Sequence, residues 1–128
     1  MPDLLSQVLL VAFGGSVGAV ARLLVNLAVT ARFGQLLPWG TFAINVSGCF
    51  ALGLVLGSLQ AGALHPLARP LVATGFLGAY TTFSTFGAET IVLLEEGSVL
   101  LAAVYVGGSV VLGLLAAAAG LALGRSLT

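Results

Sequence analysis

The chain has 128 residues, of which 59% are hydrophobic and only 6% are charged, and its mean hydropathy is +1.19. A water-soluble domain of this size needs a far more polar surface, so the composition predicts an integral membrane protein. The formal net charge is zero and Lys is absent, which argues against nucleic acid as a partner and against attachment to anionic lipid by a polybasic patch.

Charged and turn-forming residues divide the chain into four apolar segments, each long enough for a membrane helix of about 20 residues. The predicted spans are residues 4–29, 38–62, 67–94 and 98–123 of a single membrane domain. Pro near a helix start and Gly near a helix end fit this division. We therefore predict an all-α membrane protein with four transmembrane helices per subunit.

The first span contains Gly14 and Gly18, and then Arg22. Small residues four apart let helix backbones approach closely, and the same spacing recurs at residues 53 and 57, 113 and 117, and 120 and 124. Plain helix packing is the preferred interpretation of all four pairs. Arg22 is costly deep in lipid, so it is expected to snorkel near the end of its span. Two roles stay open for Arg22, namely drawing anions to a vestibule and anchoring the helix.

The second span places Thr41, Asn45 and Gly48 along one helix face, because these residues are four and three apart. A side-chain amide in hydrocarbon needs a hydrogen-bonding partner, so Asn45 either ties two helices together or serves a function. Cys49 is the single cysteine, which excludes an internal disulfide and predicts a buried, unreactive thiol.

The third span contains an unusual stretch at residues 75–86, GFLGAYTTFSTF. Glycine, β-branched threonine and a run of hydroxyls all weaken a helix, so we predict that the helix unwinds here and then resumes. Irregular backbone at membrane depth survives only where it is buried in protein or lines a polar cavity. The stretch therefore indicates an ion or solute site.

Two phenylalanines of this stretch, Phe83 and Phe86, are three residues apart and share a helix face with Glu89. Aromatic residues in membrane helices usually serve packing, and spacing alone favours that interpretation. Three hydroxyl residues lie beside these rings: Thr82, Ser84 and Thr85. A ring edge is positive and a hydroxyl is a hydrogen-bond donor, so the presence of these hydroxyl residues beside the rings favours an anion site.

Three sequence motifs together resemble those of the small bacterial fluoride channels of the Fluc or CrcB family. They are residues 14–22 (GGSVGAVAR), residues 40–50 (GTFAINVSGCF) and the pattern GxxTTFSTF at residues 78–86. The motifs follow the family's order, and the resemblance covers nearly the whole chain. It implies a fluoride-selective channel in the cell inner membrane that lets fluoride leave the cell passively and so lowers its toxicity.

The resemblance also implies an antiparallel, dual-topology homodimer in which the broken third helices cross at the centre. It further implies two pores and a structural Na⁺ that is not transported, which we assign to backbone carbonyls of Gly78 and Thr81. The near-equal count of Arg on the two sides of the membrane leaves insertion in both orientations open. Unwinding would free the carbonyl oxygens that such a cation needs.

The pore assignment carried by the resemblance rests on Asn45, on the two phenylalanines and on a polar track in the last span. Tyr105 and Ser109 begin that track, but Gly113 stands where a further hydroxyl is expected. Glu89 would repel an anion, so it is expected to bond a Thr or backbone donor outside the narrow path. The predicted pore-lining residues are Thr41, Asn45, Thr82, Phe83, Ser84, Thr85, Phe86, Tyr105 and Ser109, and Arg22 is the vestibule candidate.

Two other functions compete with a channel. A proton-coupled small-multidrug transporter also has four short spans, but it needs an acidic residue in its first helix, and residues 4–29 contain none. A non-transporting helper subunit would leave the polar face of Thr41 and Asn45 without a role. An enzyme is not indicated, because the lone His65 lies in a loop and no span carries paired carboxylates or a metal-ligand cluster.

Overall fold

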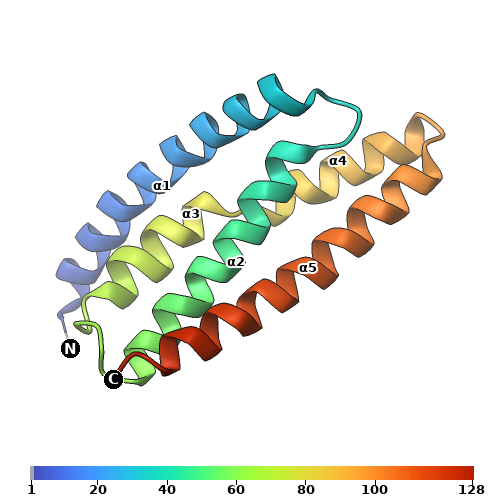
Figure 1. Cartoon of the computed structure of the whole chain (residues 1–128). Coiled ribbons are helices and arrows are strands. Elements are labelled where there is room, and N and C mark those ends of the chain that lie inside the picture. The colour runs from blue at the N-terminus through green and yellow to red at the C-terminus, as the bar shows by residue number, and fades with distance from the viewer. Residues whose placement is uncertain (1) are drawn as a thin grey trace.

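The computed structural model describes residues 2–128, and all regular secondary structure in that range is helical. The elements are α1 (Leu4–Phe33), α2 (Trp39–Gln60), η1 (Arg69–Leu77), α3 (Gly78–Tyr80), α4 (Phe83–Glu95) and α5 (Val99–Arg125). The helix η1 is a π-helix. Both chain ends lie at the same end of the molecule, and the turns between α1 and α2 and between α4 and α5 lie at the other end (Figure 1).

Three helices, α1, α2 and α5, are long and apolar enough to cross a membrane. Their bounds coincide with the segments predicted at residues 4–29, 38–62 and 98–123 to within a few residues. The segment predicted at 67–94 is divided among η1, α3 and α4. Each of these helices is shorter than the 18 residues taken as the minimum for a candidate membrane-spanning helix. The coarse prediction of an all-helical, multi-pass membrane protein is therefore confirmed.

Helix ends follow local sequence rules. Asp3 precedes α1, and its carboxylate accepts a hydrogen bond of 2.7 Å from the Ser6 amide, which lowers the pKa of the Asp3 carboxyl. Gly34 ends α1 with a positive φ of 80°, a conformation that suits glycine. Because Gly34 supplies that stop, α1 continues four residues beyond the predicted boundary.

Glycines bring two pairs of helices into backbone contact. A Cβ on Gly53 or Gly57 of α2 would overlap carbonyl oxygens of α5, and a Cβ on Gly120 or Gly124 of α5 would overlap those of α2. The same holds for Gly14 and Gly18 of α1 against the backbone of η1. Three of the four predicted small-residue pairs therefore pack as expected. Gly113 has more room, because its Cβ would lie 3.5 Å from the Cys49 sulfur.

A substitution within this α2–α5 contact should destabilise the protein. In Gly120→Ala the new methyl group would overlap the Phe50 carbonyl oxygen, so the helices must separate at a cost of about 1–3 kcal/mol. Gly107→Ala is the matched control on α5, because nothing lies within 4 Å of the position that its new methyl group would take. Thermal unfolding in detergent should show a lower midpoint for Gly120→Ala only. Equal midpoints for the two variants would contradict this account of the contact.

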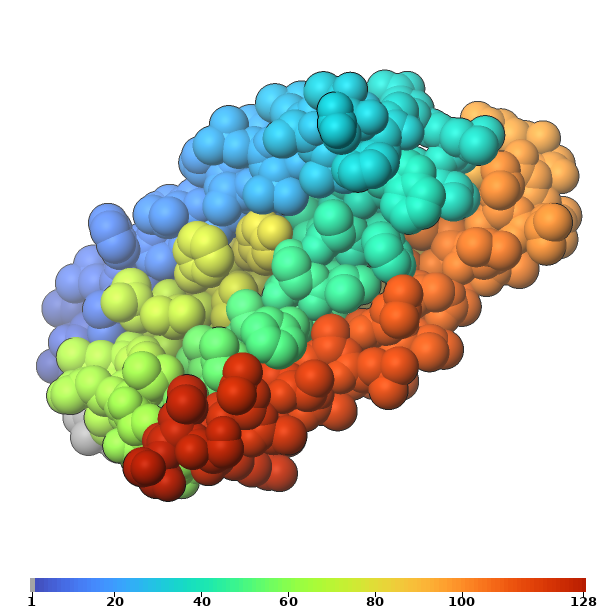
Figure 2. Space-filling model, viewed as in Figure 1, coloured from blue at the N-terminus to red at the C-terminus, as the bar shows by residue number. Residues whose placement is uncertain are grey.

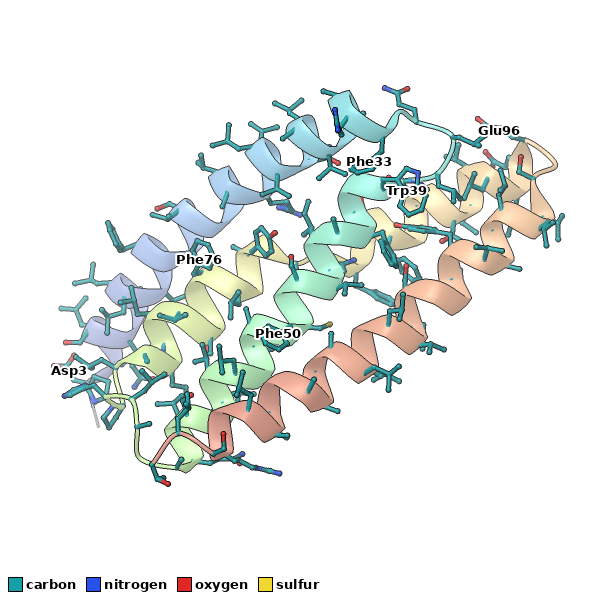
Figure 3. All side chains as sticks on the ribbon, viewed as in Figure 1. Asp3, Phe33, Trp39, Phe50, Phe76 and Glu96 are labelled. Carbon is teal, nitrogen blue, oxygen red and sulfur yellow. The ribbon has the colours of Figure 1, made fainter. Side chains whose placement is uncertain are left out.

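The exterior of the chain is apolar along most of its length. Among residues 2–128, the buried hydrophobic core is limited to Ile44, Ala73, Leu77, Leu93, Ala102 and Tyr105, while many Leu, Val and Phe side chains point outward. Figure 2 shows one face of the molecule, on which α2 lies between α1 and α5. Phe33 and Trp39 lie near one end of the molecule (Figure 3), where aromatic residues suit the membrane–water interface. Such an apolar exterior suits the hydrocarbon core of a membrane.

Candidate ion pathway

Helical backbone stops at Thr81 and Thr82, between α3 and α4. Thr81 has φ −79° and ψ 157°, and Thr82 has φ −148° and ψ 117°, so both are extended. The interruption falls inside the stretch of glycine and hydroxyl residues where the sequence predicts unwinding. Its polar backbone groups need partners other than those of a helix.

Asn45 of α2 supplies partners for Thr82. Its side-chain oxygen accepts from the Thr82 amide at 2.8 Å, and its side-chain nitrogen donates to the Thr82 carbonyl at 2.9 Å. The Thr82 hydroxyl in turn caps α4 by accepting from the Thr85 amide at 3.2 Å, and Thr82 is buried. This pairing holds the two extended residues against α2.

Two backbone carbonyls beside the interruption lose their helical donors as a result. The amide four residues after Gly78 belongs to Thr82, which bonds Asn45 instead. The amide four residues after Thr81 belongs to Thr85, which bonds the Thr82 hydroxyl instead. The oxygens of Gly78 and Thr81 are therefore left without the amide bonds of a continuous helix.

A hollow of about 290 Å³ adjoins the interruption, and we call it the phenylalanine hollow. Its lining residues are Asn45, Gly48, Cys49, Leu52, Thr81, Thr82, Phe83, Phe86, Ser109 and Val110. The rings of Phe83 and Phe86 have centroids 5.9 Å apart. The Ser109 hydroxyl oxygen is buried and has no hydrogen-bond partner among residues 2–128. The hollow thus combines two aromatic rings with a buried hydroxyl that has no partner in the described part of the chain.

Glu89 of α4 joins three helices through its carboxylate. One oxygen accepts from the Thr41 hydroxyl at 2.6 Å and from the Tyr105 hydroxyl at 3.4 Å. The bond to a threonine donor agrees with the expectation for Glu89. Tyr105 also packs against Phe86, with ring centroids 5.2 Å apart, and its side chain is buried. The carboxylate therefore lies close to the phenylalanine pair while its charge is partly satisfied.

Two further hollows lead away from this region. The arginine hollow, of about 310 Å³, is lined by Ala19, Arg22, Leu23, Asn26, Thr41, Ile44, Thr82, Thr85 and Glu89. The rim hollow, of about 430 Å³, is lined by Asn26, Thr30, Gly34, Gln35, Leu36, Leu37, Pro38, Gly40, Ala88, Glu89, Val92, Leu93 and Glu96. Asn26 and Glu89 border both of these hollows, and Thr82 borders the arginine and phenylalanine hollows. The arginine hollow therefore shares lining residues with each of the other two hollows.

This succession runs inward from one end of the molecule. Glu96, at the rim, lies at the end opposite Asp3 in Figure 3. Polar side chains continue from the rim through Asn26 and Arg22 to Thr82. Such side chains offer hydrogen-bonding and charged groups to water and to a small ion between the surface and the interruption.

Comparison with known proteins decides the family. A profile described as CrcB-like protein, Camphor Resistance (CrcB), matches residues 9–121. The chain belongs to the CrcB-like family. A relative from Acidobacterium capsulatum, named fluoride-specific ion channel FluC, is 47% identical over 118 residues, covering 91% of this chain and 94% of its own length. A relative from Nitrobacter hamburgensis, named fluoride-specific ion channel FluC 2, is 49% identical over 122 residues, covering 94% and 98%.

The resemblance drawn from the three motifs is therefore confirmed at the level of the family. A third relative, from Magnetococcus marinus, is 46% identical over 120 residues and covers 93% of this chain and 98% of its own. It is also named fluoride-specific ion channel FluC. Matches of this extent place all three motifs within one CrcB-like chain rather than in separate local similarities.

The predicted site residues of this CrcB-like chain fall into groups in the structure. Asn45, Thr82, Phe83, Phe86 and Ser109 share the phenylalanine hollow, whereas Arg22, Thr41, Thr82 and Thr85 share the arginine hollow. Tyr105 borders neither hollow. It donates a hydrogen bond to Glu89, and its ring packs against that of Phe86. Ser84 is exposed, and its hydroxyl lies 3.4 Å from that of Thr82.

Sequence reasoning misses two residues that line hollows in this CrcB-like chain. Cys49 is expected to serve packing alone, although it borders the phenylalanine hollow and is half-buried. Asn26 is not among the predicted residues, although it is a polar residue four positions after Arg22 in the first span and therefore lies on the same helix face. That spacing is the signal that could have identified Asn26.

Proposed function

We propose that this protein is a fluoride-selective channel that lets fluoride leave the cell passively across the inner membrane. The observation that carries the proposal is the phenylalanine hollow, where the unpartnered Ser109 hydroxyl lies beside two aromatic rings. A buried donor without an acceptor suits an anion, and the positive ring edges add to the attraction. The names of the relatives supply the identity of the anion.

Fluoride sheds water only where other donors replace its hydration. On this route the Arg22 guanidinium draws the ion inward, and hydroxyls of Thr85 and Ser109 replace water. The Thr82 hydroxyl, which also lines the route, donates its hydrogen to the Thr85 hydroxyl. The second N–H of the Asn45 amide is a further donor, because only one of the two is used on Thr82. An inside-negative membrane potential favours the exit of a monovalent anion by about 2.3 kcal/mol per 100 mV.

Efflux from liposomes tests this function. Purified protein in liposomes loaded with fluoride should release it within seconds when charge is balanced by a K⁺ ionophore, and should not release chloride. A proton-coupled small-multidrug transporter would instead exchange protons for a cationic dye and leave fluoride inside. Release of neither ion would favour a helper subunit and defeat the channel proposal.

We further propose that η1, α3 and α4 form one membrane crossing, broken at Thr81 and Thr82, and that two chains pair as an antiparallel homodimer. The support is the surface beside the break. Phe83 is 84% exposed in the single chain, and Ser84 and Thr85 are exposed too. Hydroxyls and irregular backbone cannot face lipid at that depth, so a second copy is the cover that the proposal assigns to them.

Dual topology has a direct test. Cys49 is half-buried within α2, so a cysteine introduced at Glu95, the exposed last residue of α4, would be the accessible thiol. We expect a membrane-impermeant maleimide to label about half of the Glu95→Cys chains in intact spheroplasts, and the rest only after permeabilisation. The parent protein without this cysteine is the control for Cys49. Complete labelling from one side would exclude insertion in both orientations.

We also propose that a structural Na⁺ is held where the two interruptions meet. Among residues 2–128, no group of three or more His, Cys, Asp or Glu side chains is placed to hold a metal ion, and the proposal rests on backbone carbonyls. The carbonyls of Gly78 and Thr81 suit a cation, because both lack their helical amide partners. When bound, Na⁺ would offset the dipoles of these oxygens and stabilise the break.

If backbone oxygens hold the ion, Thr81→Ser should have a mild effect. The Thr81 hydroxyl donates to the Leu77 carbonyl at 3.0 Å, and serine retains that donor while leaving the backbone carbonyl in place. We expect unfolding midpoints of wild type and Thr81→Ser to fall by similar amounts when Na⁺ is replaced by N-methylglucamine. A variant that no longer responds to Na⁺ would point to side-chain ligation and contradict this assignment.

A further inference from the structure

A polar stripe on α1 lines the route from the rim toward Arg22. Arg22, Asn26 and Thr30 follow one another at intervals of four and therefore share one face of the helix. Thr30 borders the rim hollow, Arg22 borders the arginine hollow, and Asn26 borders both. Asn26 thus stands at the passage from one hollow to the next.

The Asn26 amide packs against Gly40 of α2. A Cβ on Gly40 would overlap the Asn26 side-chain oxygen and would lie 3.2 Å from the Asn26 Cα. Gly40 is buried, so the amide oxygen rests against its bare Cα where α2 passes α1. The oxygen is the end of the amide that lies against α2, so the nitrogen is the end left for other partners, and no side chain or backbone group in the range 2–128 forms a hydrogen bond with it.

Charge around the passage explains why a neutral donor is useful there. Glu89 and Glu96 border the rim hollow, so an anion that enters must pass carboxylates before it reaches the Arg22 guanidinium. One oxygen of Glu89 already accepts bonds from Thr41 and Tyr105, which reduces its repulsion without removing it. An amide donor between the rim and Arg22 offers the anion a bond and adds no charge that would trap it.

We propose that Asn26 is an anion-binding residue of the entry route and that Gly40 is the positioning residue that directs its amide nitrogen into the passage. The ligand is a small monovalent anion that still carries part of its hydration shell. This inference rests on the proposed channel function and adds a site on α1 that lies outside the phenylalanine hollow.

The test measures initial fluoride flux in liposomes at low and at saturating fluoride for wild type, Asn26→Ala, Gly40→Ala and the double variant. Asn26→Ala removes one donor and should lower flux at low fluoride by about threefold to tenfold, with a smaller loss at saturation. Gly40→Ala should displace the amide and give a similar loss. Because both act through one bond, Gly40→Ala should add no further loss in the Asn26→Ala background.

Ser16→Ala is the matched control on α1, because the Ser16 hydroxyl bonds the Phe13 carbonyl and borders none of the three hollows. It should conduct like wild type. Wild-type flux in Asn26→Ala would overturn the inference. It would also be overturned if Gly40→Ala lowered flux as much in the Asn26→Ala background as in the wild type, because the new methyl group would then act by separating α1 from α2. Asn26 is exposed in the single chain, so its alanine variant stays informative even where Gly40→Ala fails to fold. If the wild-type protein conducted no fluoride, the proposed channel function itself would be wrong. Failure of the proposed function is therefore distinguishable from failure of the inference about Asn26.

Discussion

Replacing Asn45 with leucine should lower fluoride flux by about tenfold or more and destabilise the protein. Leucine has the same branching as asparagine but cannot form either hydrogen bond to the Thr82 backbone, which Asn45 makes at 2.8 and 2.9 Å. Each buried polar group left without a partner costs about 1–3 kcal/mol. A loss of about 1.4 kcal/mol already shifts the population of the working conformation tenfold, so the extended backbone at Thr82 should no longer be held in place.

The control for Asn45→Leu is Ser47→Ala on the same helix. The Ser47 hydroxyl lies 3.0 Å from the Tyr80 hydroxyl and borders none of the three hollows, so its removal should leave flux near that of wild type. Flux in liposomes and unfolding midpoints in detergent are the two measurements. If Asn45→Leu conducted like wild type, the Asn45–Thr82 pair would be dispensable, and the account of the interruption would be wrong.

Much of the fold follows from hydropathy and from turn residues. Long apolar segments without charge predict α1, α2 and α5, and Gly34, Gly62 and Gly97 adopt the positive φ angles that end helices or turn the chain. The π-helical form of η1 was not predictable in this way. Its backbone lies against Gly14 and Gly18 of α1, and such close contact depends on how segments far apart in sequence pack.

The site was predictable in its residue types and less so in its contacts. The hydroxyl-rich stretch and Asn45 stand out in the sequence as polar groups that need partners at membrane depth. That they are partners of each other, 37 positions apart, could not be read from a helical spacing. Glu89 was expected to find a threonine donor, but the choice of Thr41 depends on the crossing of α2 and α4. The periodicity of a segment shows which residues share one face of its helix. It does not show which other helix that face packs against.

Replacing either Phe83 or Phe86 with isoleucine should slow fluoride flux by about fivefold. Isoleucine keeps apolar bulk but lacks the positive ring edge, and one aromatic contact of this kind is worth on the order of 1 kcal/mol, which is about a factor of five in rate. Phe86 also contacts Tyr105, whose hydroxyl bonds Glu89, so Phe86→Ile should disturb the polar track more than Phe83→Ile does. Phe83 is 84% exposed in the single chain, so its substitution leaves the core unchanged.

Phe13→Ile on α1 is the control for these two variants. It distinguishes an effect of the rings at the phenylalanine hollow from a general effect of losing an aromatic residue. Phe13 is 67% exposed and borders none of the three hollows, so this variant should conduct like wild type. Flux is measured in liposomes at matched protein density, with dimer elution in detergent as the check on assembly. Wild-type flux in both Phe83→Ile and Phe86→Ile would make the two rings packing residues. A loss confined to these two variants, with assembly intact, would mean that the ring edges lower the barrier for a small anion that has left water.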